Sequence, residues 1–438
     1  MADPTNRPDQ PGGITMTVGD PPGDGSVLDE PIVDLPGADV SEAVPPRRRD
    51  PDETPLLDVV GLRTYFHTRN GTVQAVDGVD LSVCRGEVLG VVGESGCGKS
   101  VTSLSVLGLV PYPGEITEGT VTFDGQELTA MGQKQLAKLR GDRISMIFQQ
   151  PTSALNPVFR AGKQIEEVYQ LHRDYPEDER ATRAVEMLRR VGIPDPARRA
   201  EAYPHELSGG MAQRVMIAMA LACEPDLLIA DEPTTALDVT IQAQILDLVR
   251  DLVAESDTAV IMITHDLGVI AEMADRVAVM YAGQVVEEAD VITLFEDPRH
   301  PYTQGLIGSM PVLGDIRDDL DTIPGVVPTL VDPGVGCRFA ARCRSRIEYG
   351  LEECTRVDPE LLPVAGGSVD QVVRCFLHHD VDGNPRELSP LEPGTVDAPT
   401  TADAGAHGGD DEAVGRGDAI GRGDAVGRDD PTRDGGLS

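Results

Sequence analysis

The strongest signal in this sequence is Gly93-Glu94-Ser95-Gly96-Cys97-Gly98-Lys99-Ser100. It follows the apolar run Val88–Val92 and precedes a helical pattern that includes Leu104. Glycines at these places let the backbone curl so that its N–H groups point at phosphate oxygens, and the start of the helix adds partial positive charge. Lys99 is expected to reach the β- and γ-phosphates, and the Ser100 hydroxyl to bind Mg²⁺. The stretch therefore predicts a loop that binds ATP with magnesium.

Further short apolar runs are typical of buried strands, and they are Ile144–Phe148, Leu227–Ala230, Val260–Thr264 and Val277–Tyr281. Between them lie apolar residues at helical spacing, as at Ala184, Val185, Leu188 and Val191. Strands that alternate with helices predict an α/β fold with a mainly parallel sheet. Phosphate sites in such sheets lie beyond the carboxyl ends of the strands, where the motifs of this chain fall.

Two carboxylates, Asp231 and Glu232, follow the run Leu227–Ala230. Asp231 is placed to hold magnesium, through water, and Glu232 to orient or deprotonate the attacking water. Taken alone, the motif also fits an ordinary strand that ends in an acidic turn. Its pairing with the phosphate loop favours the catalytic interpretation.

A third motif is Leu207-Ser208-Gly209-Gly210-Met211-Ala212-Gln213-Arg214. Ser208 stands where a helix is expected to begin, ahead of an apolar stretch that ends near Ala222. The glycines leave backbone N–H groups bare at the helix N-terminus, which is a second anion site. The spacing by itself also fits a plain helix cap with a flexible entry.

With these motifs in order, the sequence resembles the nucleotide-binding subunit of ATP-binding cassette (ABC) transporters, whose distinguishing motif is LSGGMAQ, here at 207–213. The resemblance implies an ABC-type ATPase domain over about 56–310 with a helical subdomain over about 151–225. It also implies that Ser208, Gly209 and Gly210 of a second subunit cover the γ-phosphate of ATP held by the first. Two sites then form between two cassettes.

The same resemblance implies roles for four further residues. They are Gln149 as the Q-loop glutamine that contacts magnesium and the catalytic centre, Asp238 in the D-loop, His265 as the switch histidine, and Phe66 as the aromatic that stacks on adenine. From the residues alone, Gln149 or Gln150 fits a strand cap, and His265 fits an ordinary core or surface histidine. Phe66 fits a core position, and the adjacent Tyr65 is the other aromatic that the register allows at this place.

Stretches 149–157, 300–306 and 323–325 narrow the resemblance to oligopeptide and dipeptide importers, a group that includes nickel importers. These subunits carry an extension, here about 311–380. Gln150 departs from the group, where many relatives have an acidic residue. The resemblance implies transport ATPase activity, a related but non-identical ATPase partner, two membrane-spanning permease subunits and an external solute-binding protein. A soluble cassette ATPase of DNA repair or translation and a non-hydrolysing regulatory module are the alternatives, and the presence of Glu232 and His265 argues against the second.

Four of the seven cysteines crowd into the extension, namely Cys337, Cys343, Cys354 and Cys375. Structural disulfides are not expected in a cytosolic chain, so the four thiolates indicate a metal site. Zinc sites usually have close C-x₂₋₄-C pairs, which are missing here, and the open spacing suits an iron–sulfur cluster better. The resemblance likewise implies a [4Fe–4S] cluster, with zinc as the second alternative and unligated cysteines as the third.

Charge and composition set the remaining limits. Acidic residues outnumber basic ones by 74 to 37, which opposes nucleic-acid binding through a diffuse basic surface. So acidic a chain with scarce lysine suggests a protein that is kept soluble in concentrated salt. This hypothesis would be dropped if the protein folded and worked equally well in dilute buffer. Residues 1–55 and 381–438 are predicted to be disordered acidic segments. No apolar run approaches the ~18–20 residues of a membrane helix, so a soluble cytoplasmic protein is expected, which only a partner could bring to a membrane. The resemblance to transporter subunits implies a place at the cytoplasmic face of the membrane, held there by the permease subunits.

Overall fold

The computed structural model describes residues 47, 53–234, 239–310, 323–368 and 370–390. One sheet is antiparallel in the order β2-β1-β4-β5, with β1 (Leu57–Thr68), β2 (Gly71–Val83), β4 (Gly114–Phe123) and β5 (Gln126–Glu127). The second sheet has the order β11-β12-β10-β9-β3-β8-β7-β6. Its parallel strands are β3 (Val88–Val92), β6 (Ile144–Ile147), β7 (Leu227–Asp231), β8 (Ala259–Ile263) and β9 (Arg276–Tyr281).

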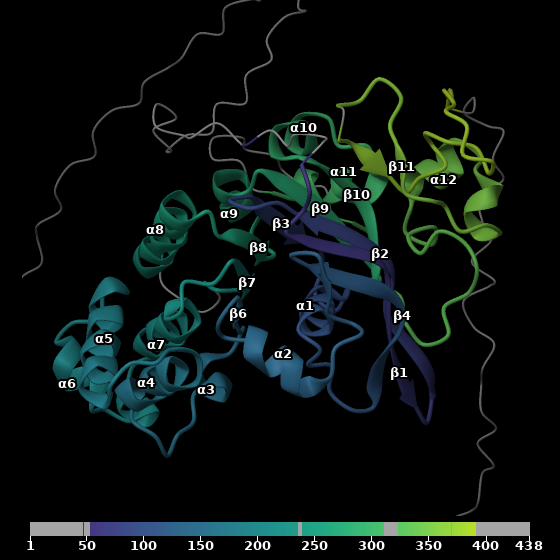
Figure 1. The fold of residues 1–438 in the computed structure, drawn as a ribbon. Coiled ribbons are helices and arrows are strands. Elements are labelled where there is room, and N and C mark those ends of the chain that lie inside the picture. Colours follow the sequence, from purple (N-terminus) through teal and green to yellow (C-terminus); the bar gives the residue numbers. More distant parts are fainter. Residues whose placement is uncertain (1–46, 48–52, 235–238, 311–322, 369, 391–438) are drawn as a thin grey trace, which may run out of the picture. The chain divides into compact units, whose positions relative to one another are not determined.

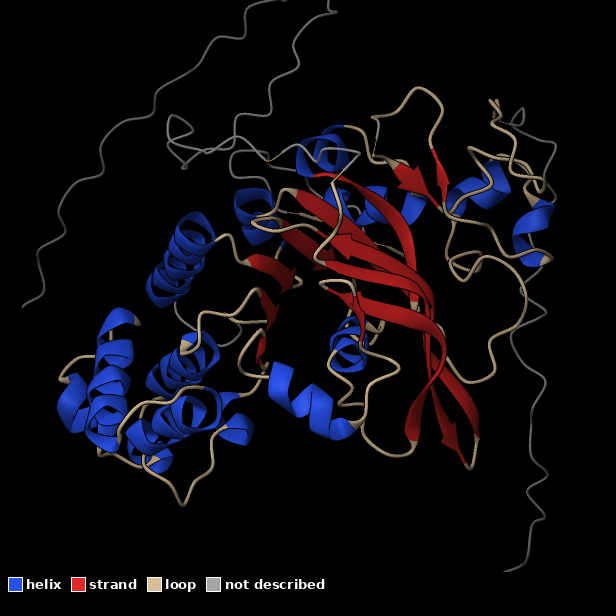
Figure 2. Cartoon of the chain, in the orientation of Figure 1, coloured by secondary structure: helices blue, strands red, loops and turns tan. Residues whose placement is uncertain are grey.

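Antiparallel strands extend the second sheet past β9, and they are β10 (Gln284–Asp290), β12 (Val372–Val373) and β11 (Leu362–Pro363). The last two belong to the C-terminal extension. Backbone hydrogen bonding between β10 and β12 therefore makes the extension continuous with the sheet of the ATPase domain. The ribbon in Figure 2 shows both sheets in red.

The parallel strands are buried on both faces because two hydrophobic cores meet at them. In β8, Val260 and Met262 pack into a core with the surrounding helices, while Ile261 and Ile263 pack into a core with β1, β2 and β4. Side chains alternate between the two faces of a strand, so a strand with a core on each face must be apolar at every position. This explains the continuous apolar runs in the sequence.

The helices of the ATPase domain follow the predicted alternation. Helix α1 (Lys99–Val106) lies against both sheets, and its Ser105 hydroxyl is 2.7 Å from that of Thr64 in β1. A helical subdomain, at the left of Figure 1, contains α3 (Pro151–Ala154), α4 (Ala161–His172), α5 (Glu177–Arg190), α6 (Pro196–Ala200), the 3₁₀ turn η2 (Pro204–Glu206) and α7 (Gly209–Leu221). The other helices of the described residues are α2 (Gln133–Leu139), α8 (Val239–Ser256), α9 (Leu267–Met273), α10 (Val291–Glu296), α11 (Pro301–Gly308), α12 (Arg344–Glu348) and η3 (Glu352–Thr355).

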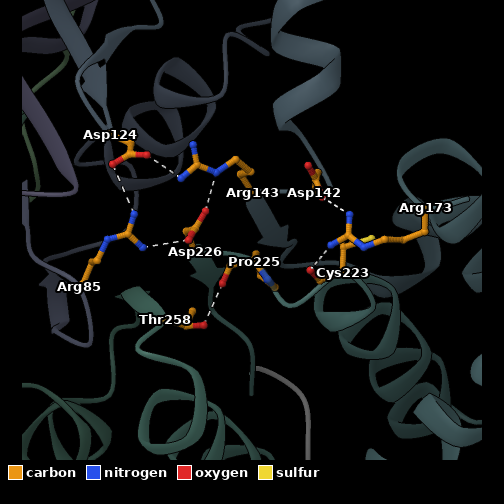
Figure 3. Close-up of polar contacts among 9 residues, drawn as sticks. All are labelled: Arg85, Asp124, Asp142, Arg143, Arg173, Cys223, Pro225, Asp226 and Thr258. Atoms are coloured by element: carbon orange, nitrogen blue, oxygen red, sulfur yellow. Dashed lines mark hydrogen bonds and ion pairs between the residues drawn. The ribbon is translucent and has the colours of Figure 1, made fainter.

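A charged network closes the amino ends of the parallel strands (Figure 3). Arg143, just before β6, donates to Asp226 (2.6 Å), just before β7, and to Asp124 (2.8 Å), just after β4. Arg85, before β3, bonds the same two carboxylates. The network thus ties the two sheets together at the amino ends of the parallel strands. The predicted catalytic residues lie at the opposite, carboxyl ends.

The described part of the chain reaches Pro390, beyond the predicted start of the tail at 381. Arg386 holds this segment because it donates to Glu353 at 2.7 Å. Within the described residues, no helix combines the length and the apolar character needed to cross a membrane.

Candidate active site

The phosphate loop connects β3 to α1 and depends on two of its glycines. Gly93 and Gly98 have φ angles of 151° and 107°. A Cβ atom would lie 2.2 Å from the Met280 carbonyl oxygen at Gly93, and 2.3 Å from that of Ala75 at Gly98. Only glycine fits such backbone angles and such close approaches. Lys99 is buried, and its Nζ donates to the carbonyl oxygens of Gly93 (2.6 Å) and Glu94 (3.1 Å), so its charge lies inside the loop.

Asp231 ends β7 beside this loop, with its carboxylate buried. Burial raises its pKa, while a hydrogen bond with the Ser100 side chain and the charge of Lys99 oppose the rise. Its Oδ1 atom has no hydrogen-bond partner among the described residues. A buried carboxylate oxygen without a donor, next to a serine hydroxyl, suits a hard cation that prefers oxygen ligands. The donors Asp231 and Ser100 therefore fit Mg²⁺.

Gln149, Glu232 and His265 come together although 83 residues separate the first two. The Gln149 Nε2 atom donates to Glu232 Oε2 at 2.7 Å, and His265 Nδ1 lies 3.4 Å from Glu232 Oε1. They follow β6, β7 and β8, which are neighbours in the sheet, so parallel topology brings them to one edge. The backbone of Glu232 is left-handed (φ 48°), and its N–H donates to the Ile263 carbonyl at 2.8 Å. A carboxylate held in this way can accept a proton from water.

Ser208 caps α7, as the sequence predicts. Its hydroxyl accepts a hydrogen bond from the Met211 N–H at 3.3 Å, and Ser208 and Gly209 are exposed at the helix tip. A Cβ at Gly209 would meet no atom within 4 Å, so space is open there. The helix is also tied to the segment after Glu232, because the buried Gln213 side chain donates to the Pro233 carbonyl at 2.6 Å.

The predicted adenine-stacking residue Phe66 lies in β1 of the antiparallel sheet, not at the strand ends that carry this cluster. Phe66 is half-buried in β1, opposite Gly114 of β4. A Cβ atom added at Gly114 would lie 2.6 Å from the Phe66 ring, so the ring packs directly on the glycine. The Tyr65 hydroxyl donates to Asp77 at 2.7 Å, so it is occupied within the protein. Asp238 lies outside the described residues.

Two residues missed by sequence reasoning contact Glu94 of the phosphate loop. The Glu94 N–H donates to the Tyr302 hydroxyl at 2.8 Å. The Arg342 guanidinium bonds both carboxylate oxygens of Glu94, at 2.6 and 3.0 Å. Tyr302 belongs to the motif 300–306, and Arg342 lies between Cys337 and Cys343. These positions were the features of the sequence that could have drawn attention to the two residues.

The four cysteines of the extension are free and buried or half-buried. Burial raises the thiol pKa of Cys337 to about 11 and of Cys354 to about 12, and the neighbouring thiols add to the rise. The pKa of Cys375 is also raised by burial and by the other three. In the described ranges, however, no three His, Cys, Asp or Glu side chains are arranged to hold a single metal ion.

Comparison with known proteins identifies the families that this chain resembles. The family model "ABC transporter" matches residues 76–235, and "Oligopeptide/dipeptide transporter, C-terminal region" matches 286–349. The oligopeptide transport ATP-binding protein AppD of Bacillus subtilis is 49% identical over 326 residues, covering 74% of this chain and 97% of the relative. The dipeptide transport ATP-binding protein DppD of Escherichia coli is 46% identical over 330 residues, covering 75% and 99%. A dimeric ATP-binding cassette solved with ADP and Pi has a TM-score of 0.50 and 30% identity, over 54% of this chain and 98% of that one.

Proposed function

Because the chain belongs to the family of ATP-binding subunits of ABC transporters, we propose that its ATP hydrolysis powers the import of peptides. The peptide cargo is supported by the names of the relatives and by the match of the extension to the oligopeptide/dipeptide transporter region. Nickel or another small solute is the alternative cargo. The observation that carries the ATPase chemistry is the meeting of Gln149, Glu232 and His265 at the strand edge that also bears the phosphate loop.

In the proposed mechanism the loop 93–100 holds the phosphates through its N–H groups and Lys99. Ser100, Asp231 and Gln149 are the residues that would hold Mg²⁺, which would neutralise negative charge on the phosphates of ATP. Glu232 accepts a proton from the attacking water, and the Gln149 amide and the His265 ring keep its carboxylate oriented. Phe66 is proposed to stack on adenine.

The exposed helix tip of Ser208 and Gly209 supports pairing with a second cassette. Bare N–H groups at a helix N-terminus attract a γ-phosphate that is held by the other subunit. The proposed partner is a related, non-identical ATPase, with Asp238 of each chain at the contact. ATP binding then closes the pair, and hydrolysis releases it.

Permease subunits are proposed to dock on the helical subdomain beside Gln149. Val158 and Phe159 follow that residue closely, and they are 70% and 51% exposed. Adjacent exposed apolar side chains are typical of a protein–protein contact. Docking there would hold the chain at the cytoplasmic face of the membrane, with the solute-binding protein acting from the other side.

Purification from native membranes tests this function. We expect the tagged full-length chain to bring down two multi-span proteins and a second cassette ATPase. Deletion of its gene should abolish peptide uptake but leave nickel uptake unchanged, with uptake restored by the wild-type gene and not by Lys99→Ala. If the deletion abolished nickel uptake but not peptide uptake, the cargo would be nickel. If the tagged chain purified with a DNA-repair or ribosomal complex instead, the transport function would be rejected.

We also propose that Cys337, Cys343, Cys354 and Cys375 hold an iron–sulfur cluster, with zinc as the alternative. The gathering of four buried or half-buried thiols supports it, because Cys337, Cys343 and Cys354 all lie close enough to Cys375 to raise its thiol pKa. We expect anaerobically purified protein to contain iron and sulfide and to absorb near about 400 nm. Cys354→Ser should lose both signals, and Cys223→Ser, at a buried cysteine of the ATPase domain, should keep them. Colourless protein that contains zinc would reject the cluster.

A further inference from the structure

Two side chains outside the ATPase motifs, Tyr302 and Arg342, contact Glu94, the second residue of the phosphate loop. Tyr302 accepts the Glu94 N–H, and Arg342 bonds its carboxylate through two nitrogens. The same guanidinium donates to the carbonyl oxygens of Pro324 (2.7 Å) and Gly325 (3.4 Å). These contacts account for the motifs at 300–306 and 323–325, which the catalytic chemistry leaves unused.

An aromatic cluster fixes the position of Arg342. The rings of Tyr281, Tyr302 and Phe339 are buried, with centroids 4.7 Å apart for the two tyrosines and 5.2 and 5.5 Å from Phe339 to each. The Arg342 guanidinium carbon lies 5.7 Å from the Tyr281 centroid and 5.9 Å from that of Phe339. Its side chain is only 6% exposed. Arginine held in this way has little freedom to leave Glu94.

A second anchor holds the same segment. Arg338 donates to the Gln74 side chain at 2.9 Å and pairs with Asp77 of β2, and it also donates to the Ala282 carbonyl. Arg338, Phe339 and Arg342 therefore dock the extension as one unit on the sheet and on the loop. Among the polar contacts that the described residues make, Arg342 is the one of these three side chains that bonds a residue of the phosphate loop.

The charge of Glu94 connects this contact with the binding of ATP. Glu94 adjoins Gly93, and its own carbonyl oxygen accepts from Lys99 at 3.1 Å. A carboxylate at this place repels the phosphates of ATP unless a cation neutralises it. Its backbone also sets the direction of the loop N–H groups. Arg342 satisfies both needs, since it neutralises the carboxylate and fixes its position.

We propose that Arg342 is a positioning residue of the nucleotide site, which acts through Glu94 to hold the phosphate loop in its ATP-binding form. The extension is then part of the ATP site and not only an appendage to it. This inference rests on ATP binding at residues 93–100. It predicts that the effect of Arg342 on ATP affinity depends on the negative charge of Glu94.

A double-mutant cycle on the full-length chain tests the proposal, with ATP and Mg²⁺ in equilibrium dialysis. We expect Arg342→Gln to raise the dissociation constant about tenfold in the wild-type background and less than about twofold in a Glu94→Gln background. Arg342→Lys should restore part of the affinity, because it keeps the charge but loses the paired hydrogen bonds. Arg356→Gln, an exposed arginine of the same extension, should leave affinity unchanged.

Equal loss of affinity in both backgrounds, or no loss in either, would overturn the proposal. Thermal unfolding measured without nucleotide distinguishes a loss of loop positioning from a loss of folding. We expect the Arg342→Gln protein to unfold as cooperatively as the wild type. If that variant unfolds, Arg342→Lys measured against Glu94→Gln provides the same cycle. Lys99→Ala must lose ATP binding in the same assay. If Lys99→Ala loses binding and Arg342→Gln does not, the proposed ATP site is supported and only the proposed role of Arg342 is rejected.

Discussion

Lys99→Ala protein is expected to lose ATP binding by at least ~100-fold and to show almost no turnover. The Lys99 ammonium is buried within the loop, 2.6 Å from the Gly93 carbonyl oxygen, so its charge is poorly screened by water. The other three lysines of the chain, Lys134, Lys138 and Lys163, are exposed at the surface, so none of them takes the place of the buried Lys99 ammonium. Alanine removes the charge and also leaves two loop carbonyls without their donor.

Lys138→Ala is the matched control for this experiment, since Lys138 is exposed in the last turn of α2. Equilibrium dialysis with ATP and Mg²⁺, followed by phosphate release from the transporter assembled with its partners, gives the two readouts. A Lys99→Ala protein that consumed ATP at the wild-type rate would remove the loop 93–100 from the chemistry.

The parallel strands could be predicted from sequence because burial on both faces makes their signal continuous. The predicted run Val88–Val92 coincides with β3, and the other predicted runs lie within one residue of β6, β7, β8 and β9 at each end. The antiparallel sheet was not predicted. In β1 the pairing register shifts between Val59 and Leu62 and again between Thr64 and Tyr65, so the apolar alternation is broken. Such irregular strands have no clean two-residue period.

The active site was only partly accessible to sequence reasoning. The motifs at Asp231, Glu232 and His265 each follow an apolar run, and parallel topology alone predicts that they share one edge. The pairing of Arg342 with Glu94 has no comparable signal, because 248 residues separate them and the contact depends on how the extension docks. The cysteine count indicated a cluster, but the distances among the thiols depend on the turns of the extension, which have no periodic pattern.

Glu232→Gln protein is expected to bind ATP normally and to turn over at least ~100-fold more slowly. Glutamine keeps the size of the side chain and an oxygen that can accept the Gln149 hydrogen bond, 2.7 Å long in the native protein. The amide cannot take a proton from water, so only the chemical step is lost. Glu348→Gln, at an exposed glutamate of α12, is the matched control.

The same variant also separates the catalytic role of Glu232 from a structural one. Its backbone is left-handed at φ 48°, and residues in such conformations are often held there for function. If Glu232 serves catalysis, the variant accumulates ATP-bound cassette pairs, because closure is intact and release through hydrolysis is not. If Glu232 only maintains the strand edge, ATP binding and pairing fall together with turnover. Unchanged turnover would exclude Glu232 as the base and direct the search to His265, whose Nδ1 atom lies 3.4 Å from the Glu232 carboxylate.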